Sequence, residues 1–367
     1  MPIAKKNQLV GLDIGSHSIK VVEIGETKKG RILENFGMIG LPRNAIIEGS
    51  IKEMEIVASA IKNLFRNLKI KNKNVATSIS GYSVIVKKIS IEKRAESELE
   101  ATIHDEAEQY IPFDINDVNL DYEIIQPQNA VAESEHPGGG EEGKDVGSGL
   151  MEVMLVAAKR DMVEDYVSLL QLAGLNPVIL DVDAFALQNA FEVSTEEPQG
   201  CYALVNLGAE ELEINAVKDG VSIFTRDSSY GGAQITEAIM AKFDASWDEA
   251  EKIKLGGLEA EGRRQELEEI FANVVSGWGQ EIKRALDFLA TTYPEETIEK
   301  LFLSGGSIRI PGFKRYLELE TDLPVVEMNP FANLQINEKV FDPRYLSYMA
   351  PQAAVAVGLA LRSIGDK

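Results

Sequence analysis

The stretch YALVNLGAEELEINAV, residues 202–217, decides the fold, because its pattern also stands near the start of the chain. The earlier copy is LVGLDIGSHSIKVVEI, residues 9–24, and alignment of the two places Asp13 against Asn206. Each copy has an apolar run, a polar residue, a small-residue turn and a second apolar run, a pattern that predicts a β-hairpin. The duplication indicates two related halves. The acid of the first copy is an amide in the second, and this change calls for a physical reason.

Composition limits the class of protein. The chain has 367 residues, enough for two domains, and 44% hydrophobic residues, as in a globular protein. A net charge of −22 argues against non-specific binding to nucleic acid or to anionic lipid. One cysteine permits no internal disulfide, and with only three histidines a structural zinc site is not expected. The chain has no long apolar stretch, so we expect no signal peptide, no membrane-spanning helix and a cytoplasmic location.

The first ninety residues predict an α/β unit. Strands are expected on both sides of the turn at 13–18, then over 32–40, 74–80 and 83–91. Apolar residues at helical spacing predict a helix over about 51–68, with Ser50 and Glu53 as a capping box. Strands, a long helix and more strands are typical of an α/β fold.

From Ala95 the pattern changes, which indicates an inserted block. An apolar stripe predicts a helix that ends at Pro112, followed by strands at NLDYEII and MEVMLVAAK. The Gly-, Glu- and Ser-rich segment between them is predicted to be a flexible loop over 126–150. A helix capped by Asp161 with Glu164, and a strand at PVILDVD, complete the block.

The second half opens with a linker at 194–200 and the repeated hairpin. A helix capped by Ser246 and Glu249 follows, and then a long amphipathic helix over about 264–292. The segment EKLFLSGGSIRIPGFKRYLEL predicts a strand, a glycine turn and a helix, and APQAAVAVGLALRS predicts a small-residue helix near the C-terminus.

Three small-residue turns are the candidates for ligand binding: DIGSHS at 13–18, NLGAEE at 206–211 and SGGS at 304–307. Glycine lets the backbone approach a phosphate, and successive amide groups in such a turn can bind an anion. A single turn of this kind is an ordinary hairpin turn. Two related turns that open two halves, and a third after a later strand, fit a nucleotide held between the halves.

These segments carry a resemblance. GLDIGSHSIKVVEI, VNLGAEELEI, LFLSGGSIRIPGF and APQAAVAVGLALR look like the phosphate-1, phosphate-2, adenosine and second connect motifs of the actin-like ATPase superfamily. EAEQYIPFDINDVNLDY and AEKIKLGG narrow the resemblance to the PilM family of type IV pilus assembly proteins, which is related to the cell-division actin homologue FtsA. The resemblance covers about residues 8–363, with all motifs in order.

The resemblance implies an α/β, actin-like two-domain ATPase fold, built on a ribonuclease H-like repeat, with an FtsA-type 1C subdomain. The implied divisions are subdomain 1A at 1–89 with 182–196 and 344–367, 1C at 90–181, 2A at 200–235 and 297–343, and 2B at 236–296.

The resemblance also implies ATP and Mg²⁺ in the cleft between the domains. Asp13 would hold Mg²⁺ through waters, since Mg²⁺ keeps several of its own. Alternatively, Asp13 is a turn residue, Lys20 a solvated strand lysine, and Glu251 and Lys254 an exposed helix ion pair. The residues implied to bind nucleotide are Asp13, Gly15, Ser16, His17, Ser18, Lys20, Asn206, Gly208, Ala209, Gly231, Gly232, Glu251, Lys254, Gly305, Gly306 and Ile308.

Asn206 weakens the case for an enzyme. In relatives an acid at this place helps to activate the attacking water, whereas an amide cannot accept a proton at neutral pH. The family's threonine five or six positions later is replaced by Glu211 and Leu212. We therefore expect no catalytic residue here, and an ATP-binding protein that hydrolyses ATP slowly or not at all.

The family resemblance implies partners. PilM-like proteins are adaptors on the cytoplasmic face of the inner membrane that bind the N-terminal tail of PilN, within the PilN/PilO complex, and we also expect contact with the pilus motor ATPases. Tyr110, Ile111 and Phe113 are candidate contacts for the peptide, and ordinary packing at a helix end is the alternative. FtsA relatives continue into an amphipathic membrane helix that this sequence does not show, so we expect recruitment through a protein rather than lipid.

Two other classes of function stay open on the sequence alone. A filament-forming cytoskeletal ATPase of the FtsA or MreB kind would use the same fold. A small-molecule kinase of the same superfamily would need a substrate-side carboxylate base, for which the sequence has no motif.

Overall fold

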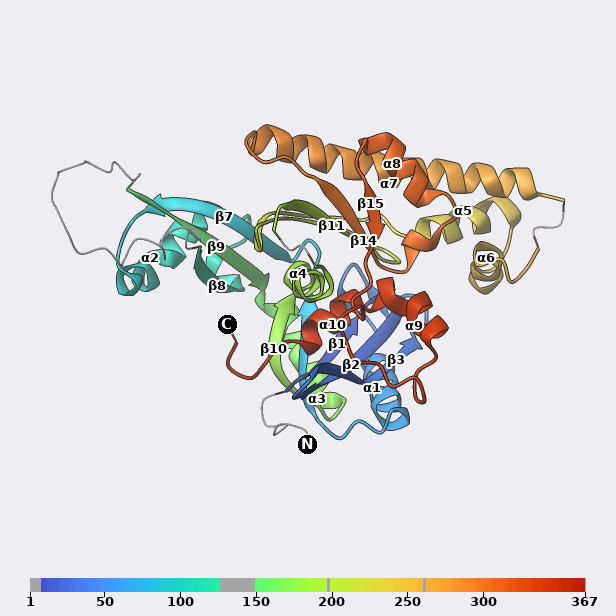
Figure 1. Cartoon of the computed structure of the whole chain (residues 1–367), viewed down its shortest axis with the longest axis horizontal. Coiled ribbons are helices and arrows are strands. Elements are labelled where there is room, and N and C mark those ends of the chain that lie inside the picture. The colour runs from blue at the N-terminus through green and yellow to red at the C-terminus, as the bar shows by residue number, and fades with distance from the viewer. Residues whose placement is uncertain (1–7, 126–148, 197–198, 260–261, 367) are drawn as a thin grey trace. The chain divides into compact units, whose positions relative to one another are not determined.

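The computed structural model describes residues 8–125, 149–196, 199–259 and 262–366 (Figure 1). It forms two compact units, a large one of residues 1–82 with 165–367 and a small one of residues 83–164. Most of the predicted loop at 126–150 lies outside the described residues. No helix among the residues described has the length and apolar character needed to cross a bilayer.

Sheet I of the large unit has the strand order β10-β6-β1-β2-β3. β1, β2 and β3 are antiparallel neighbours, whereas β6 runs parallel to β1, and β10 runs parallel to β6. The predicted first hairpin and third strand are confirmed. The strands are β1 (Val10–Ile14), β2 (Ser18–Thr27), β3 (Gly30–Gly40), β6 (Asn74–Ile79) and β10 (Asn176–Val182).

Sheet II repeats this topology with the order β13-β12-β11-β14-β15. Again three antiparallel strands are followed by two strands parallel to the first. The duplicated hairpin of the sequence is therefore the start of a duplicated five-stranded sheet. The strands are β11 (Cys201–Leu207), β12 (Leu212–Lys218), β13 (Val221–Ser228), β14 (Lys300–Ser304) and β15 (Val325–Glu327).

Helices cover both faces of sheet I, which explains why β1 is buried along its whole length. On one face, a Cβ on Gly11 would lie 2.1 Å from the carbonyl oxygen of Ala356, so α10 (Ala354–Ala360) approaches the strand closely. On the other face, Gly37 faces the side chain of Leu68, at the end of α1 (Met54–Asn67). Glycine at both positions allows a helix segment to lie against the sheet.

Sheet II has its own core on its outer face. Trp278, Ile282 and Leu289 of the long helix α7 pack there with strand residues such as Val205, and α7 has the bounds that the sequence predicted. The helices and short elements of this part are α5 (Ala233–Phe243), α6 (Trp247–Lys254), α7 (Arg264–Thr292), α8 (Phe313–Thr321) and the 3-10 turn η4 (Ser307–Arg309).

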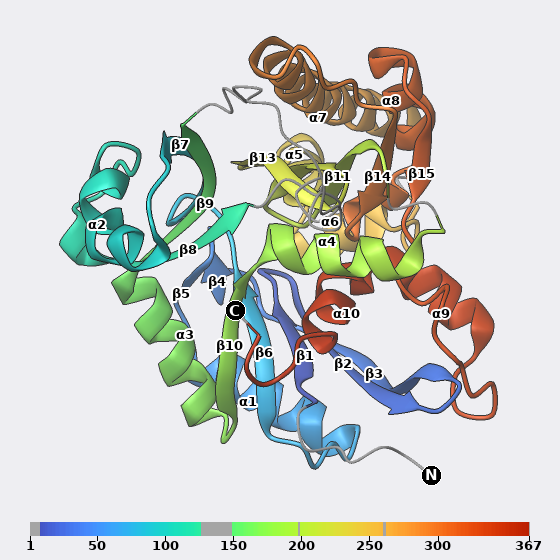
Figure 2. The same ribbon diagram turned by 60° about the vertical axis from the view of Figure 1, so that its left-hand side comes forward.

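A shared core joins the inner faces of the two sheets. Val22 of β2 and Leu204 of β11 belong to one buried cluster with Phe191 of α4 (Asp183–Ser194) and the small residues of α10. α4 and α10 lie side by side (Figure 2). A Cβ on Gly358 would lie 1.7 Å from the carbonyl oxygen of Ala186, so only glycine permits this close crossing. The cluster is completed from α9 (Pro343–Met349) and the 3-10 turn η5 (Ala350–Ala353).

The small unit is a three-stranded sheet of order β7-β9-β8 with one helix on its core side. Leu99, Ile103 and Ala107 form the buried stripe of the helix, as their four-residue spacing predicts. The elements are β7 (Val84–Glu92), α2 (Glu96–Glu108), the 3-10 turn η2 (Ile115–Asp117), β8 (Val118–Ile125) and β9 (Leu150–Lys159).

The structure differs from the sequence predictions in three places. Ser50 lies in the two-residue strand β5 (Ser50–Ile51), which pairs with β4 (Ile46–Ile47), so it does not cap α1. The helix predicted to be capped by Asp161 begins at Arg160, as α3 (Arg160–Leu172), so Asp161 lies inside its first turn and is not the cap. The compact insert spans 83–164 rather than 90–181, because β10 pairs with β6 and so belongs to sheet I.

Candidate functional site

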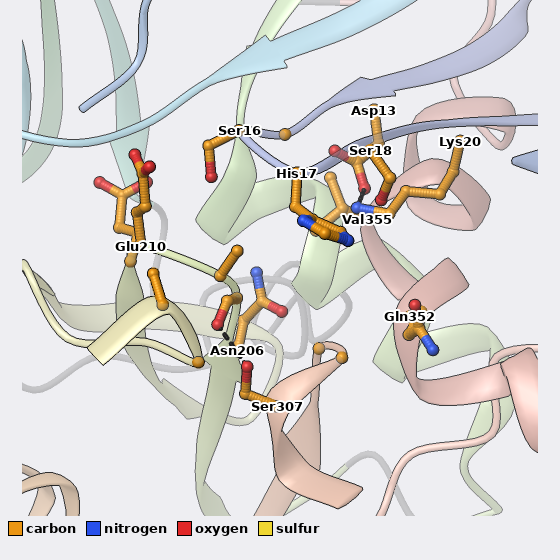
Figure 3. A pocket seen from close by; sticks show the side chains of 18 of the residues that line it. Asp13, Ser16, His17, Ser18, Lys20, Asn206, Glu210, Ser307, Gln352 and Val355 are labelled. Carbon is orange, nitrogen blue, oxygen red and sulfur yellow. Dashed lines mark hydrogen bonds and ion pairs between the residues drawn. The ribbon is translucent and has the colours of Figure 1, made fainter. Parts of the chain in front are cut away.

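The large unit contains a cavity of about 640 Å³ onto which all three predicted turns open. Side chains of Ser16, His17 and Lys20 enter it from the sheet I side, and those of Asn206 and Ser307 from the sheet II side (Figure 3). Of the sixteen residues that the sequence indicates, fourteen line the cavity. Gly231 and Ile308 are the two that do not.

The first turn presents free donors beside an ion pair. Gly15 donates its N–H to the carbonyl oxygen of Ser18, which closes the turn between β1 and β2. Within the described residues, the amide N–H groups of Ser16 and His17 have no hydrogen-bond acceptor. The Lys20 ammonium lies 3.1 Å from the Asp13 carboxylate (Figure 3). This arrangement suits an anion, because unused N–H groups and a lysine face the same space.

The second turn has the same construction. Gly208 donates its N–H to the carbonyl oxygen of Glu211, and the amides of Ala209 and Glu210 have no acceptor in the described part of the chain. Gly231 lies behind this turn, where a Cβ would come within 2.3 Å of the carbonyl oxygen of Ala209. Gly231 therefore supports the turn and is not on the surface of the cavity.

The third turn is fastened to the second. The Ser307 hydroxyl donates to the carbonyl oxygen of Gly208 at 2.6 Å, and Gly305 has a φ of +93°, which glycine adopts without strain. Gly305 and Gly306 reach the cavity, whereas Ile308 is buried in the core of sheet II. The sequence pattern could not separate these roles, since all three residues fall within one short motif.

Glu251 and Lys254 form a partly buried pair rather than an exposed helix ion pair. The Lys254 ammonium contacts the Glu251 carboxylate at 2.5 Å, the Thr236 hydroxyl at 2.9 Å and the Gly232 carbonyl oxygen at 3.3 Å. Both side chains line the cavity and are less than 15% exposed. The network holds α5 and α6 together and presents a carboxylate and an ammonium to the cavity.

Asn206 is held on one side of its amide and faces a buried acid on the other. The Ser304 hydroxyl donates to its Oδ1 at 3.3 Å, and the Asn206 side chain favours the charged form of Glu213. Glu213 lies opposite Asn206 in the register of β11 and β12 and is buried. Burial, and then the neighbouring Asp183, Asp227 and Glu211, raise the pKa of Glu213 well above its ordinary value. An acid at 206 would face this carboxyl group, which gives the amide a physical reason.

Asp183 is a cavity residue that we did not predict. It begins α4, immediately after the parallel strand β10, and a carboxylate at such a strand end is the signal that the sequence offered. Burial raises the pKa of Asp183 to about 7; Asp13 adds to the shift, and hydrogen bonds to Ser78 and Ser80 oppose it. Glu213, Arg309, Tyr348 and Gln352 also line the cavity and were not predicted.

His17 lines the cavity in its neutral form. Burial lowers its pKa, and Lys254 and Lys20 add to this effect while Glu251 opposes it. At neutral pH the imidazole therefore carries no charge that would attract a phosphate. Any anion contact at this position would come mainly from the free backbone N–H group.

A divalent ion would have few protein ligands here. No group of three or more His, Cys, Asp or Glu side chains in the described residues is arranged to hold a metal. Asp13 is the carboxylate next to both the first turn and Lys20, and it reaches the cavity. This donor set fits Mg²⁺ held by one carboxylate, waters and phosphate oxygens, the usual arrangement for that ion with nucleotides.

The candidate peptide contacts lie in the small unit. Ile111 is buried in its core, and Tyr110 and Phe113 pack against that core. The Lys87 ammonium lies 5.3 Å from the centroid of the Tyr110 ring, and Lys159 lies 4.5 Å from that of Phe113. The burial of Ile111 supports the packing alternative for this residue. Tyr110 and Phe113 are partly exposed, and a lysine ammonium lies over each of the two rings.

Comparison with known proteins decides the family. Residues 11–364 match the family model described as type IV pilus assembly protein PilM. The chain belongs to the PilM family. A solved structure titled as the PilM-PilN type IV pilus biogenesis complex is 28% identical, covers 98% of this chain and 99% of the matched chain, and superposes with a TM-score of 0.83.

A more distant structure supports the fold alone. The ethanolamine utilization protein EutJ from Carboxydothermus hydrogenoformans is 14% identical, with a TM-score of 0.57 over 98% of this chain and 91% of its own. Together with the repeated sheet topology and the PilM match, this confirms the predicted actin-like α/β fold.

Proposed function

We propose that this PilM-family protein is an ATP-binding adaptor of the type IV pilus machine, which binds the cytoplasmic N-terminal tail of PilN and links the membrane complex to the cytoplasmic motor. The observation that carries the proposal is the similarity, over 98% of the chain, to the chain of a PilM-PilN complex. PilN, the PilN/PilO complex and the motor ATPases are the proposed partners. The proposed location is the cytoplasmic face of the inner membrane.

The cavity supports ATP as the ligand. Two turns with unused N–H groups face it from opposite sheets, which suits a polyphosphate, and Lys20 adds a positive charge. Glu251 and Lys254 supply a hydrogen-bonding pair for a ribose. Gly305 and Gly306 leave room for a base beside the third turn. Mg²⁺ would be held at Asp13 and would neutralise charge on the phosphates.

The side chains beside the second turn favour slow hydrolysis. Asn206 cannot accept a proton from water, and burial and the neighbouring acids raise the pKa of Glu213, which lies opposite it, well above its ordinary value. Nucleotide would then act as a conformational ligand rather than as a fuel. Purified protein that turns over ATP well above once per minute, with the activity abolished in Asp13→Ala, would contradict this part of the proposal.

Asp183 supports a second candidate, a weak ATPase. Its pKa of about 7 lies in the range in which a carboxylate can act as a general base at neutral pH. If the protein has residual turnover, Asp183→Asn should reduce it at least tenfold while ATP binding persists. Unchanged turnover in Asp183→Asn would exclude Asp183 as the base.

Calorimetry with the PilN tail, with and without ATP·Mg²⁺, tests the adaptor proposal. We expect saturable binding of the tail. We also expect ATP·Mg²⁺ to change the affinity for the tail several-fold, and the tail to change the affinity for ATP·Mg²⁺ by the same factor, because coupling between two sites is reciprocal. Asp13→Ala serves as the matched variant: the tail should still bind, and the effect of ATP·Mg²⁺ should disappear. A tail that does not bind under any condition would overturn the partner assignment. Tail binding that ignores nucleotide would overturn the coupling alone.

A further inference from the structure

Two carboxyl groups on the sheet II side, one just before β12 and one in β13, contact the short turn that follows β6 of sheet I. The Ser80 hydroxyl donates to Glu211 Oε2 at 2.8 Å, and the Gly81 N–H donates to Asp227 Oδ2 at 2.8 Å. Ser80 and Gly81 directly follow β6, whereas Glu211 precedes β12 and Asp227 lies in β13. These four residues, which we call the acid clasp, therefore connect the two sides of the cavity.

Gly81 makes the clasp geometrically possible. Its φ is +84°, in the left-handed region that favours glycine, and a Cβ at this position would lie 2.7 Å from Glu211 Oε1. The backbone of the turn thus comes close enough for its N–H group to reach Asp227. A side chain here would push Glu211 away and open the contact.

The clasp lies in a negative environment. Burial raises the pKa of Glu211, and the negative charges of Asp227 in β13, Asp183 at the start of α4 and Glu210 in its own turn raise it further. Burial and acids of the same cluster also raise the pKa of Glu213 in β12 and of Tyr166 in α3. No lysine or arginine among the described residues forms an ion pair with Glu211 or Asp227, and Lys20 is paired with Asp13. Two negative charges in the clasp would therefore repel each other, with only the hydrogen bonds from Ser80 and Gly81 to offset the repulsion.

We propose that the acid clasp is a proton-dependent latch: it holds the two sides of the cavity together while Glu211 and Asp227 share at least one proton, and it releases them when both lose their protons. This inference concerns closure of the cavity and does not depend on which ligand the cavity binds. It stands on the two hydrogen bonds, the requirement for glycine at 81 and the absence of a positive partner in the described structure.

The direction of the pH effect follows from the closed structure. Burial, and then Asp227, raise the pKa of Glu211 to about 8, and burial raises that of Asp227. Because the closed form binds these protons more tightly than an open, solvated form would, closure is fully favoured below the ordinary pKa of these groups. It is lost progressively as the pH rises through about 8. The latch is thus closed under mildly acidic conditions and weakened under alkaline ones.

Distance measurements between spin labels test the proposal. The labels go on exposed positions on either side, with Lys62→Cys on α1 and Arg264→Cys on α7, after the buried Cys201 is replaced by Ala. In this parent we expect one short distance at pH 6 and a growing longer population up to pH 9, with a midpoint close to pH 8. Addition of Glu211→Gln and Asp227→Asn should keep the short distance at pH 9, because both amides still accept the two hydrogen bonds without charge.

Two further variants make the outcome decisive. Gly81→Val should show the longer population already at pH 6 in protein with an unchanged circular dichroism spectrum. Glu269→Gln, which changes an exposed carboxylate of α7 whose hydrogen bond is to Gln265 of the same helix, should follow the parent profile. The proposal fails if the parent distance is constant from pH 6 to 9, or if the Glu211→Gln, Asp227→Asn variant opens as the parent does. Should the double variant not fold, Glu211→Gln alone must abolish the same pH dependence.

Discussion

Asn206 lies opposite Glu213 in the register of β11 and β12, at the place where Asp13 lies opposite Lys20 in the first hairpin. In the first hairpin an acid pairs with a base at 3.1 Å. In the second, an amide lies opposite a buried acid. Each hairpin therefore has a compatible cross-strand pair, an acid with a base in the first and an amide with an acid in the second. An acid at 206 would lie opposite the acid at 213, which explains the amide.

Return of the acid to the second hairpin tests why hydrolysis is slow. Asn206→Asp should raise ATP turnover by about tenfold or more, since a positioned general base contributes on the order of a hundredfold, reduced here by repulsion from Glu213. The Asn206→Asp, Glu213→Gln double variant should be faster still. The measurement is phosphate release at saturating ATP·Mg²⁺. A rate below that of the native protein in both variants would show that the acid at 206 is not what is missing.

Asp183 should make stability depend on pH. Its pKa in the folded protein is about 7, above the ordinary value, so its contribution to stability is present at low pH and is lost as the pH rises through 7. Asp183→Asn removes this loss, and we expect the variant to gain about 2 kcal/mol relative to the native protein between pH 5 and pH 8. Denaturant unfolding at both pH values measures the difference. An equal difference at pH 5 and pH 8 would contradict the assignment.

The aromatic residues at the end of α2 provide a test of peptide binding. Tyr110→Ala with Phe113→Ala should weaken binding of the PilN tail at least tenfold, because both rings are partly exposed and would lose apolar contact with the peptide. Phe288→Ala, at an aromatic residue that is 53% exposed on α7, is the control and should bind normally. Unchanged affinity in a folded double variant would leave these rings with the packing role alone.

The crossing of α4 and α10 should not tolerate a side chain. Gly358→Ala places a Cβ 1.7 Å from the carbonyl oxygen of Ala186, and we expect a loss of about 2 kcal/mol or more in the free energy of unfolding. Gly40→Ala is the matched control, since a Cβ there meets nothing within 4 Å. Thermal and denaturant unfolding compare the two. Equal stability of both variants would mean that the helices move apart at no cost.

Much of the fold could be read from local patterns. The duplicated hairpin, α7 over 264–292 and the capping box at Ser246 depend on residues close in sequence, and the structure confirms all three. The prediction that Ser50 caps α1 was wrong, because Ser50 pairs with Ile47 of β4 and so lies in a strand. The extent of the insert differed because the pairing of β10 with β6 joins residues about a hundred positions apart.

The sequence by itself determined the repeated sheet, the three turns and the membership in the PilM family, because each is written in short motifs with regular spacing. Only the tertiary structure decided which residues share the cavity and how each titrates. Asp183, Glu211, Glu213 and Asp227 come from distant segments, and their raised pKa values arise from joint burial away from positive charge. Burial and proximity are properties of the packed chain, so no local pattern could have shown that these four acids meet.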